Sequence, residues 1–370
     1  MHSDLLIVLV VGTSLAFDFT NGFHDTANVV ATSISTRALS PRVAIALAAV
    51  LNFAGAFISL KVAATIAKGI VDAGAISMII VFAGLIGAIV WNLATWYLGL
   101  PSSSSHALIG GVVGASLAAH GSSGVHFDGL LGKVIVPALL SPLLAFAVAG
   151  LAILFTYRMV GRLRPGPAKR GFRLGQVFSG GMLALAHGTN DAQKTMGVIT
   201  LALVAHGDLP GKHFAVPDWV VVSAASAIAL GTYAGGWRII RTMGSRIIKM
   251  DPAQGFTAQT AGATVILAAS HVGFPLSTTH VMAGGVMGAG AGKRVSAVRW
   301  GVASNMAIAW ILTLPAAAAA GAVTYVASRV FGNGALGPSI VIVVAACLLL
   351  AAAVRRSNRL AALRPSGVSS

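Results

Sequence analysis

The sequence has very little charge for its length. Only 9% of its 370 residues are Asp, Glu, Lys or Arg, whereas about a quarter of the residues of an ordinary soluble domain are charged. Hydrophobic residues make up 56% of the chain and the mean hydropathy is +0.86. This composition excludes a soluble globular domain and predicts an all-α polytopic membrane protein.

The sequence contains one cysteine and no glutamate. The single cysteine, Cys347, lies in an apolar run and supports neither a disulfide framework nor a thiolate metal site. All nine acidic residues are aspartates, and only Asp18, Asp25 and Asp191 lie well inside apolar stretches. Because a charged side chain at membrane depth is costly, these three carboxylates are the first candidates for functional groups.

The formal net charge of +16 raises the question of a nucleic-acid partner. The basic residues, however, gather in short loops between apolar segments, as the positive-inside rule describes for membrane proteins. We therefore expect a lipid bilayer around the chain and no nucleic acid. No basic leader precedes the first apolar segment, so no cleavable signal is expected.

Two polar motifs each occur twice. Residues 22–28 read GFHDTAN and return at 188–194 as GTNDAQK, while residues 101–106 read PSSSSH and return at 275–280 as PLSTTH. Polar groups embedded in apolar sequence need protein, water or ligand to satisfy them. Two duplicated clusters predict a duplicated fold around one central site, which is typical of secondary transporters.

Apolar segments of suitable length give about five membrane segments per half and one extra C-terminal span. They are residues 5–35, 43–60, 76–98, 104–119 and 134–157, then 174–205, 219–240, 257–272, 278–291 and 298–326, and finally 339–354. The two opening segments are long and polar at their middles, which predicts broken helices with the Asp motif at each break. The segments after Pro101 and Pro275 are predicted as re-entrant hairpin arms or short crossings.

Loop charges predict that the two halves have inverted topology. In three pairs of corresponding loops the basic bias reverses; for example, residues 120–133 are neutral overall, whereas their counterpart carries Lys293, Arg294 and Arg299. The predicted organisation is a first repeat over 1–157, a basic cytoplasmic linker over 158–173, a second repeat over 174–329, and an extra span with a basic cytoplasmic tail over 330–370. The N-terminus is then outside and the C-terminus cytoplasmic.

Hydroxyl side chains at the two predicted helix starts are candidates for anion binding. Unpaired backbone N–H groups and the positive end of a helix dipole attract anions, and a tetrahedral oxyanion offers several acceptor oxygens. The alternative is that these residues only cap helices, and hydroxyl donors alone do not distinguish phosphate from sulfate. The predicted phosphate-binding residues are Ser103, Ser104, Ser105, Ser277, Thr278 and Thr279.

The repeated Asp motifs are candidates for cation or proton coupling. Carboxylate and amide oxygens suit sodium, and a carboxylate can also carry a proton; the alternative is a purely structural role at a helix break. The predicted coupling residues are Asp25, Asp191, Asn21, Asn28, Asn190, His24 and Lys194. For the isolated Asp18, functional and structural roles stay open.

Basic side chains near the motifs admit more than one role. His24, His106, His187 and His280 are either proton-relay groups or hydrogen-bonded packing residues. Lys194, which matches Asn28 in the repeat, could replace a bound cation, contact the anion, or extend its stem towards the membrane interface.

At these residues the sequence resembles the inorganic phosphate transporter family, often called PiT. The resemblance covers nearly the whole chain, and residues 21–31 and 91–111 are similar to the bacterial low-affinity phosphate permeases in particular. It implies an inverted-repeat helical transporter in the inner membrane, dimeric, which moves phosphate with a coupling cation. His24 and Lys194 depart from the sodium-coupled pattern, which favours protons over sodium and raises the alternative of a divalent metal carried with phosphate.

The sequence therefore predicts a phosphate symporter that works by alternating access, with no enzymatic activity, no catalytic residue and no resident cofactor. A sulfate permease of the same fold and a passive anion channel are alternatives. An intramembrane aspartyl protease using Asp25 and Asp191 is disfavoured, because it leaves the duplicated serine-rich helix starts unexplained.

Overall fold

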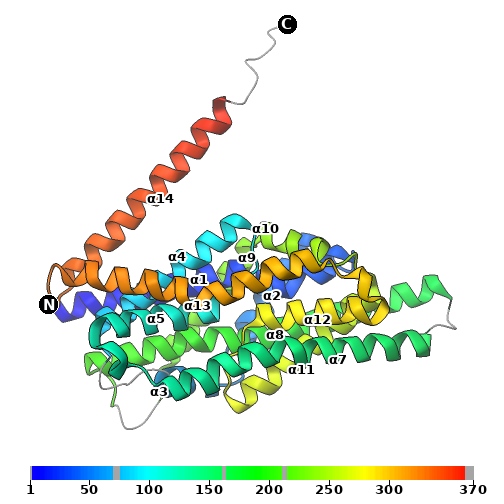
Figure 1. The fold of residues 1–370 in the computed structure, drawn as a ribbon, viewed down its shortest axis with the longest axis horizontal. Coiled ribbons are helices and arrows are strands. Elements are labelled where there is room, and N and C mark those ends of the chain that lie inside the picture. Colours follow the sequence, from blue (N-terminus) through cyan, green and yellow to red (C-terminus); the bar gives the residue numbers. More distant parts are fainter. Residues whose placement is uncertain (1, 70–75, 161–163, 211–214, 363–370) are drawn as a thin grey trace, which may run out of the picture.

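The computed structural model describes residues 2–69, 76–160, 164–210 and 215–362 of the chain. Figure 1 shows a bundle of long helices that run in roughly the same direction, with the C-terminal helix leaving the bundle at an angle. The elements of the first half are α1 (His2–Ser35), α2 (Pro41–Gly55), α3 (Lys61–Gly69), α4 (Met78–Leu98), α5 (Ser104–His120), the 3-10 turn η1 (Gly121–Gly124), α6 (Phe127–Leu130), the π-helical turn η2 (Leu131–Ile135) and α7 (Val136–Val160).

The second half has a closely similar order of elements. They are α8 (Pro165–His206), α9 (Asp218–Ala234), α10 (Trp237–Arg241), the π-helical turn η3 (Thr242–Arg246), α11 (Pro252–Val272), α12 (Thr278–Lys293), the 3-10 turn η4 (Val295–Ala297), α13 (Trp300–Arg329) and α14 (Leu336–Ala362). A helix therefore stands at every predicted segment. The segment predicted over 219–240 is divided, because α9 and the α10–η3 unit meet at a bend of 60°.

The two opening helices are continuous, so the prediction that they break at the Asp motifs is wrong. α1 has 34 residues and α8 has 42, and both run through their motifs without interruption. The expectation assumed that polar motif residues need unwound backbone as a partner. Here their partners are side chains of neighbouring helices, and the Thr26 hydroxyl donates back to the Gly22 carbonyl 2.6 Å away.

Both short serine-rich helices begin with a side-chain cap. The Ser103 hydroxyl accepts a hydrogen bond from the His106 backbone N–H at 3.1 Å, and the Ser277 hydroxyl accepts one from His280 at 3.2 Å. Each serine satisfies one of the free N–H groups of the first helical turn. α5 has 17 residues and α12 has 16, which makes each about 25 Å long, shorter than the ~30 Å hydrocarbon layer.

The first glycine of each Asp motif permits close helix packing. A Cβ on Gly22 would collide with the carbonyl oxygen of Ile228 on α9, and a Cβ on Gly188 would collide with that of Asn52 on α2. α1 therefore packs backbone to backbone against α9, as α8 does against α2. These contacts hold the two motifs at fixed positions in the bundle.

The exterior is apolar and many polar residues are inside, which is the reverse of a soluble protein. Large aliphatic side chains on α7 and α13, among them Leu151 and Ile311, are 69% and 75% exposed. Four of the described helices are long and apolar enough to cross a membrane, or five if the bent α9–α10 pair is one span. The chain is thus a multi-pass membrane protein, while the count of about five spans per half stays a prediction.

The segments that connect and follow the halves are described in part. Residues 165–173 of the predicted basic linker form the first turns of α8, whereas residues 161–163, with Arg162, lie outside the described residues. Of the predicted basic tail, residues 363–370, with Arg364, also lie outside them.

Asp251 caps the N-terminal end of α11. Burial raises the pKa of its carboxyl group, but hydrogen bonds from Gln254, Tyr157 and Lys293 outweigh this effect and hold the pKa below its usual range.

Candidate functional site

The N-terminal ends of α5 and α12 meet inside the bundle. The Ser105 hydroxyl donates to the Leu276 carbonyl oxygen at 3.2 Å. One turn into each helix, the rings of His106 and His280 lie edge to face with centroids 4.8 Å apart. The two serine- and threonine-rich motifs, which are about 170 residues apart in sequence, therefore form one cluster.

Asp25 of α1 lies among the hydroxyls of this cluster. The hydroxyls of Ser104 and Thr278 donate to its Oδ2 at 2.9 and 3.1 Å, and Thr279 contacts its Oδ1 at 3.4 Å. Asp25 is 1% exposed. One carboxylate thus receives donors from the first turns of two helices that belong to different halves of the chain.

Histidine and asparagine complete the surroundings of Asp25. The Nδ1 atom of His24 lies 2.7 Å from Asp25 Oδ1, and its Nε2 lies 3.2 Å from the Thr95 hydroxyl. Ser104 is also within 2.5 Å of the Asn21 amide oxygen. The Asn28 amide donates to the Thr279 hydroxyl at 2.8 Å, so α1 contributes four of the predicted coupling residues to this cluster.

Asp191 of α8 is paired with a buried lysine. The Lys194 ammonium lies 2.6 Å from Asp191 Oδ1 and donates to the Leu276 carbonyl oxygen at 3.0 Å and to the Ser105 hydroxyl. Lys194 is 1% exposed. The alternative in which its stem extends towards the membrane interface is therefore wrong, because the three oxygen partners hold the ammonium inside the bundle.

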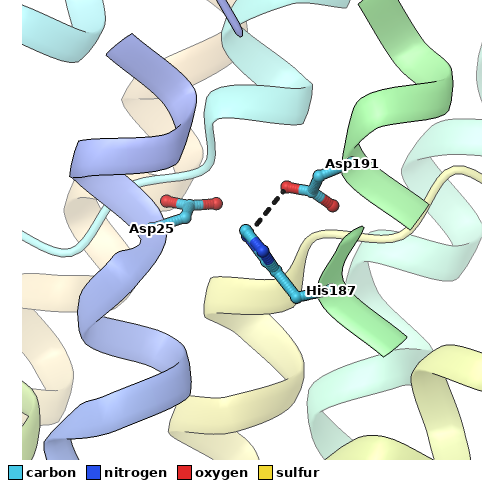
Figure 2. A group of neighbouring side chains, drawn as sticks. All are labelled: Asp25, His187 and Asp191. Atoms are coloured by element: carbon cyan, nitrogen blue, oxygen red, sulfur yellow. Dashed lines mark ion pairs between the residues drawn. The ribbon is translucent and has the colours of Figure 1, made fainter. Parts of the chain in front are cut away.

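Asp25 and Asp191 come together around His187. Figure 2 shows Asp25 on α1 facing His187 and Asp191 on α8, with His187 Nε2 3.4 Å from Asp191 Oδ2. One ligand atom from each residue lies within 4.8 Å of the others, which is close enough for one metal ion. The two Asp motifs, which are far apart in the sequence, thus lie next to each other in the bundle.

Three of the predicted site residues lie away from this centre or serve another purpose. Ser103 and Ser277 act as helix caps. The Asn190 amide donates to the Ser270 hydroxyl at 2.8 Å and to the Phe274 carbonyl oxygen at 3.3 Å, both near the end of α11. The capping alternative raised for the hydroxyl residues thus applies to one residue of each motif.

The structure places His187 and Asp18, whose roles the sequence left open, beside the residues of the two Asp motifs. His187 occupies the repeat position of Asn21, and this correspondence was the signal available in the sequence. Asp18 is fully buried beside Asn21 and Thr195, and neither of its carboxylate oxygens has a hydrogen-bond partner among the described residues. His187 is found when the comparison of the two Asp motifs is extended by one residue towards the N-terminus. Asp18 has no counterpart in the second half.

The cluster is closed to solvent in this structure. All six hydroxyl residues predicted to bind phosphate are at most 2% exposed, as are Asp25, Asp191 and Lys194. Two carboxylates, one ammonium and several hydroxyls therefore lie together in a buried volume. Solvent reaches it only if the surrounding helices move.

Comparison with known proteins decides the family. The model of the phosphate transporter family matches residues 21–170 and 162–321, which together cover most of the chain. The chain belongs to the phosphate transporter family. The resemblance expected from the two repeated motifs is therefore confirmed.

Several relatives within this family are similar over most of their length. A probable low-affinity inorganic phosphate transporter of Mycobacterium tuberculosis is 56% identical over 320 residues, which are 86% of this chain and 77% of the relative. Proteins with the same description from Rhizobium meliloti and Bacillus subtilis are 49% and 44% identical, over 87% of this chain and 96% of each relative. These names describe transporters, in agreement with the expectation that the chain is not an enzyme.

A solved structure has the same fold. A sodium-dependent phosphate transporter superposes with a TM-score of 0.76 and 25% sequence identity, covering 86% of this chain and 98% of that chain. The helical membrane architecture of the phosphate transporter family therefore extends to this chain.

Proposed function

We propose that the protein is a secondary active transporter that imports inorganic phosphate with a coupling cation by alternating access. The observation that carries the proposal is the position of Ser104 and Thr278. Their hydroxyls come from the first turns of α5 and α12 and converge on Asp25. A tetrahedral oxyanion placed there would receive donors from both halves of the protein and from two helix N-termini.

The charges of the site favour binding of a coupling cation. Asp25 and Asp191 carry two negative charges when ionised, the Lys194 ammonium offsets one, and phosphate adds at least one more. Unpaired charge in a buried volume is expensive. A proton or cation bound at Asp25 cancels one of these negative charges and lowers this penalty, so binding of phosphate and binding of its coupling ion should favour each other.

The hydroxyl hydrogens link the two binding events. Ser104 and Thr278 each have one hydroxyl hydrogen. That of Thr278 is donated to the Asp25 carboxylate, whereas that of Ser104 has two acceptors, Asp25 Oδ2 and the Asn21 amide oxygen. When a proton or cation neutralises Asp25, the hydroxyls are free to turn towards phosphate. Coupling is then a competition between a carboxylate and an oxyanion for the same donors.

The coupling ion is a proton in the favoured proposal and sodium in the alternative. His24 lies 2.7 Å from Asp25, which places a group able to relay protons directly beside the carboxylate. The similar solved structure is described as sodium-dependent, which supports sodium. A divalent metal carried with phosphate also fits the donor set, because Asp25, His187 and Asp191 offer two carboxylates and an imidazole within 4.8 Å.

Helix packing supports two inverted repeats. α5 packs against α13 of the other half, and α12 packs against α7, while α1 packs on α9 as α8 packs on α2. Equivalent helices thus make equivalent contacts across the halves, which is the arrangement that rocking of one repeat unit against another requires.

We further propose that the protein lies in the inner membrane, with its N-terminus outside and its C-terminus in the cytoplasm, and that it forms a homodimer.

An Asp25→Asn variant tests the coupling role. The amide cannot carry a charge that a cation neutralises, so proteoliposomes with this variant should accumulate less than about 1% as much phosphate as wild type. Asp208→Asn serves as the control, because Asp208 is exposed near the end of α8 and should leave uptake unchanged. Normal uptake by folded Asp25→Asn protein would contradict the proposal.

Competition assays separate the alternatives. Unlabelled sulfate should not compete for phosphate uptake, whereas a sulfate permease would show such competition. A passive channel would equilibrate phosphate without accumulating it against its gradient. Cleavage of a membrane peptide, the sign of an aspartyl protease, is not expected.

A further inference from the structure

The Asp191 half of the site already contains a cation. The Lys194 ammonium contacts a carboxylate oxygen of Asp191, a hydroxyl oxygen of Ser105 and a backbone carbonyl oxygen of Leu276. An ammonium has three hydrogens to donate, and three oxygens surround it. Carboxylate, hydroxyl and carbonyl oxygens are also the ligands that hard cations such as sodium prefer.

The equivalent position in the first half is different. Asn28 matches Lys194 in the repeat, yet its amide nitrogen donates to Thr279 rather than to Asp25. Its amide oxygen is buried and has no hydrogen-bond partner among the described residues. Within those residues, Asp25 forms an ion pair with His24 and with no lysine or arginine. The first half thus has cation ligands without a fixed ammonium.

The Lys194 contacts also cross the two halves. Asp191 belongs to α8, Ser105 to the first turn of α5, and Leu276 to the segment just before α12. A cation at this point joins one Asp motif to both hydroxyl-rich helix starts. An exchangeable ion would break these links each time it left, whereas a covalently attached ammonium does not leave with the substrate.

We propose that the Lys194 ammonium is a built-in substitute for a second coupling cation, so that only the Asp25 half of the site exchanges an ion during transport. This inference rests on the proposed phosphate transport. It predicts that each transport cycle moves one cation fewer than a site with asparagine at both repeat positions would move.

Replacement of the lysine by the residue found in the first half tests the inference. Lys194→Asn leaves the three oxygens of the cage and adds an amide oxygen, so an external cation should now be needed. In proteoliposomes at fixed ionic strength, with choline replacing sodium, we expect phosphate uptake to fall at least 10-fold and to recover as sodium is added. If wild-type uptake itself needs sodium, the variant should show a steeper sodium dependence.

A stability measurement gives a second readout that does not need transport. A ligand that binds the folded state raises its melting temperature, so the Tm of detergent-solubilised Lys194→Asn should rise by about 3 °C or more from choline chloride to sodium chloride. This rise should exceed any rise in the wild type. Adding Asp191→Asn should remove the extra rise, because the carboxylate of the cage is lost.

Lys293→Asn is the matched control. Lys293 also pairs with an aspartate, at 3.0 Å from Asp251, but it is 54% exposed, so water can replace its ammonium. Its uptake and Tm should show the same sodium dependence as wild type.

Each result distinguishes the inference from the proposed function. Absence of phosphate accumulation by wild type would overturn the proposed function, while the Tm comparison would still test the cation cage. Wild-type transport without any extra sodium effect in Lys194→Asn, on uptake or on Tm, would overturn the inference. Instability of that variant in every salt would also overturn it, because sodium would then fail to fill the cage.

Discussion

At the scale of single residues, the proposed coupling depends on a few hydroxyl hydrogens that could be donated either to Asp25 or to phosphate. Thr278 is the clearest example, since it starts α12 and its hydroxyl donates to Asp25 at 3.1 Å. Serine and threonine at helix starts usually act as caps, and Ser277 does so here. The neighbouring threonine is therefore left for the ions of the site.

Thr278→Val removes this donor with little change of shape. Loss of a hydrogen bond to a charged group costs about 1.5–3 kcal/mol, so the KM for phosphate should rise about 10-fold or more in uptake assays. Thr264→Val is the control, because Thr264 is exposed and donates only to the Thr260 carbonyl within α11. An unchanged KM in Thr278→Val would show that this hydroxyl does not bind phosphate.

The sequence identified most residues of the site but not their partners. Asp25 and Asp191 stand out because carboxylates are rare in apolar sequence, and repetition links them to the serine-rich motifs. The direction of the Lys194 side chain could not be predicted from the sequence, because a lysine side chain can extend either to the membrane interface or to a buried carboxylate. Likewise, Asn190 matches His24 in the repeat but turns to Ser270.

At the scale of helices, close backbone packing positions the motifs. Gly22 faces α9 so closely that a Cβ would collide with the Ile228 carbonyl oxygen, whereas a Cβ on Gly12, on the same helix, would meet no atom within 4 Å. The continuity of α1 and α8 follows from the same packing. Neighbouring helices supply the partners of the motif side chains, so the backbone keeps its helical hydrogen bonds.

Two glycine replacements on α1 should therefore have opposite effects. Gly22→Ala should lower the free energy of unfolding by about 1–3 kcal/mol through overpacking, while Gly12→Ala should raise it by about 0.5–1 kcal/mol through helix propensity. Thermal unfolding of both variants in the same detergent measures the difference. Equal stability of the two would show that the α1–α9 contact is not this close.

Helix positions were predictable from the sequence, but the continuity of the opening helices was not. Apolar length, prolines and glycines located α4, α5 and α12 to within two residues of the observed bounds, and α11 to within five. A polar motif in an apolar segment is consistent both with an unwound helix and with a continuous helix whose side chains have partners elsewhere. The neighbouring helices decide between them, because they supply the partners, for example Asn52 of α2 for His187 and Ser104 of α5 for Asp25.

At the scale of the whole molecule, we propose that the two halves of the chain enclose one ion site. α5 packs against α13 and α12 packs against α7, so each half contacts the other. The two Asp motifs and the two hydroxyl-rich motifs meet inside the bundle. A site that is closed to solvent on all of its predicted hydroxyls must open by movement of these helices. Loading and release of the site therefore need helix movement, and the proposed coupling predicts that an ion gradient drives it.

Uptake of labelled phosphate by proteoliposomes under an inward proton gradient, an inward sodium gradient, or neither tests this claim most directly. We expect phosphate to accumulate above its external concentration under a cation gradient, with proton drive favoured. Unlabelled phosphate should block this accumulation and sulfate should not. Equilibration of phosphate without accumulation under every gradient, or no phosphate entry at all, would contradict it.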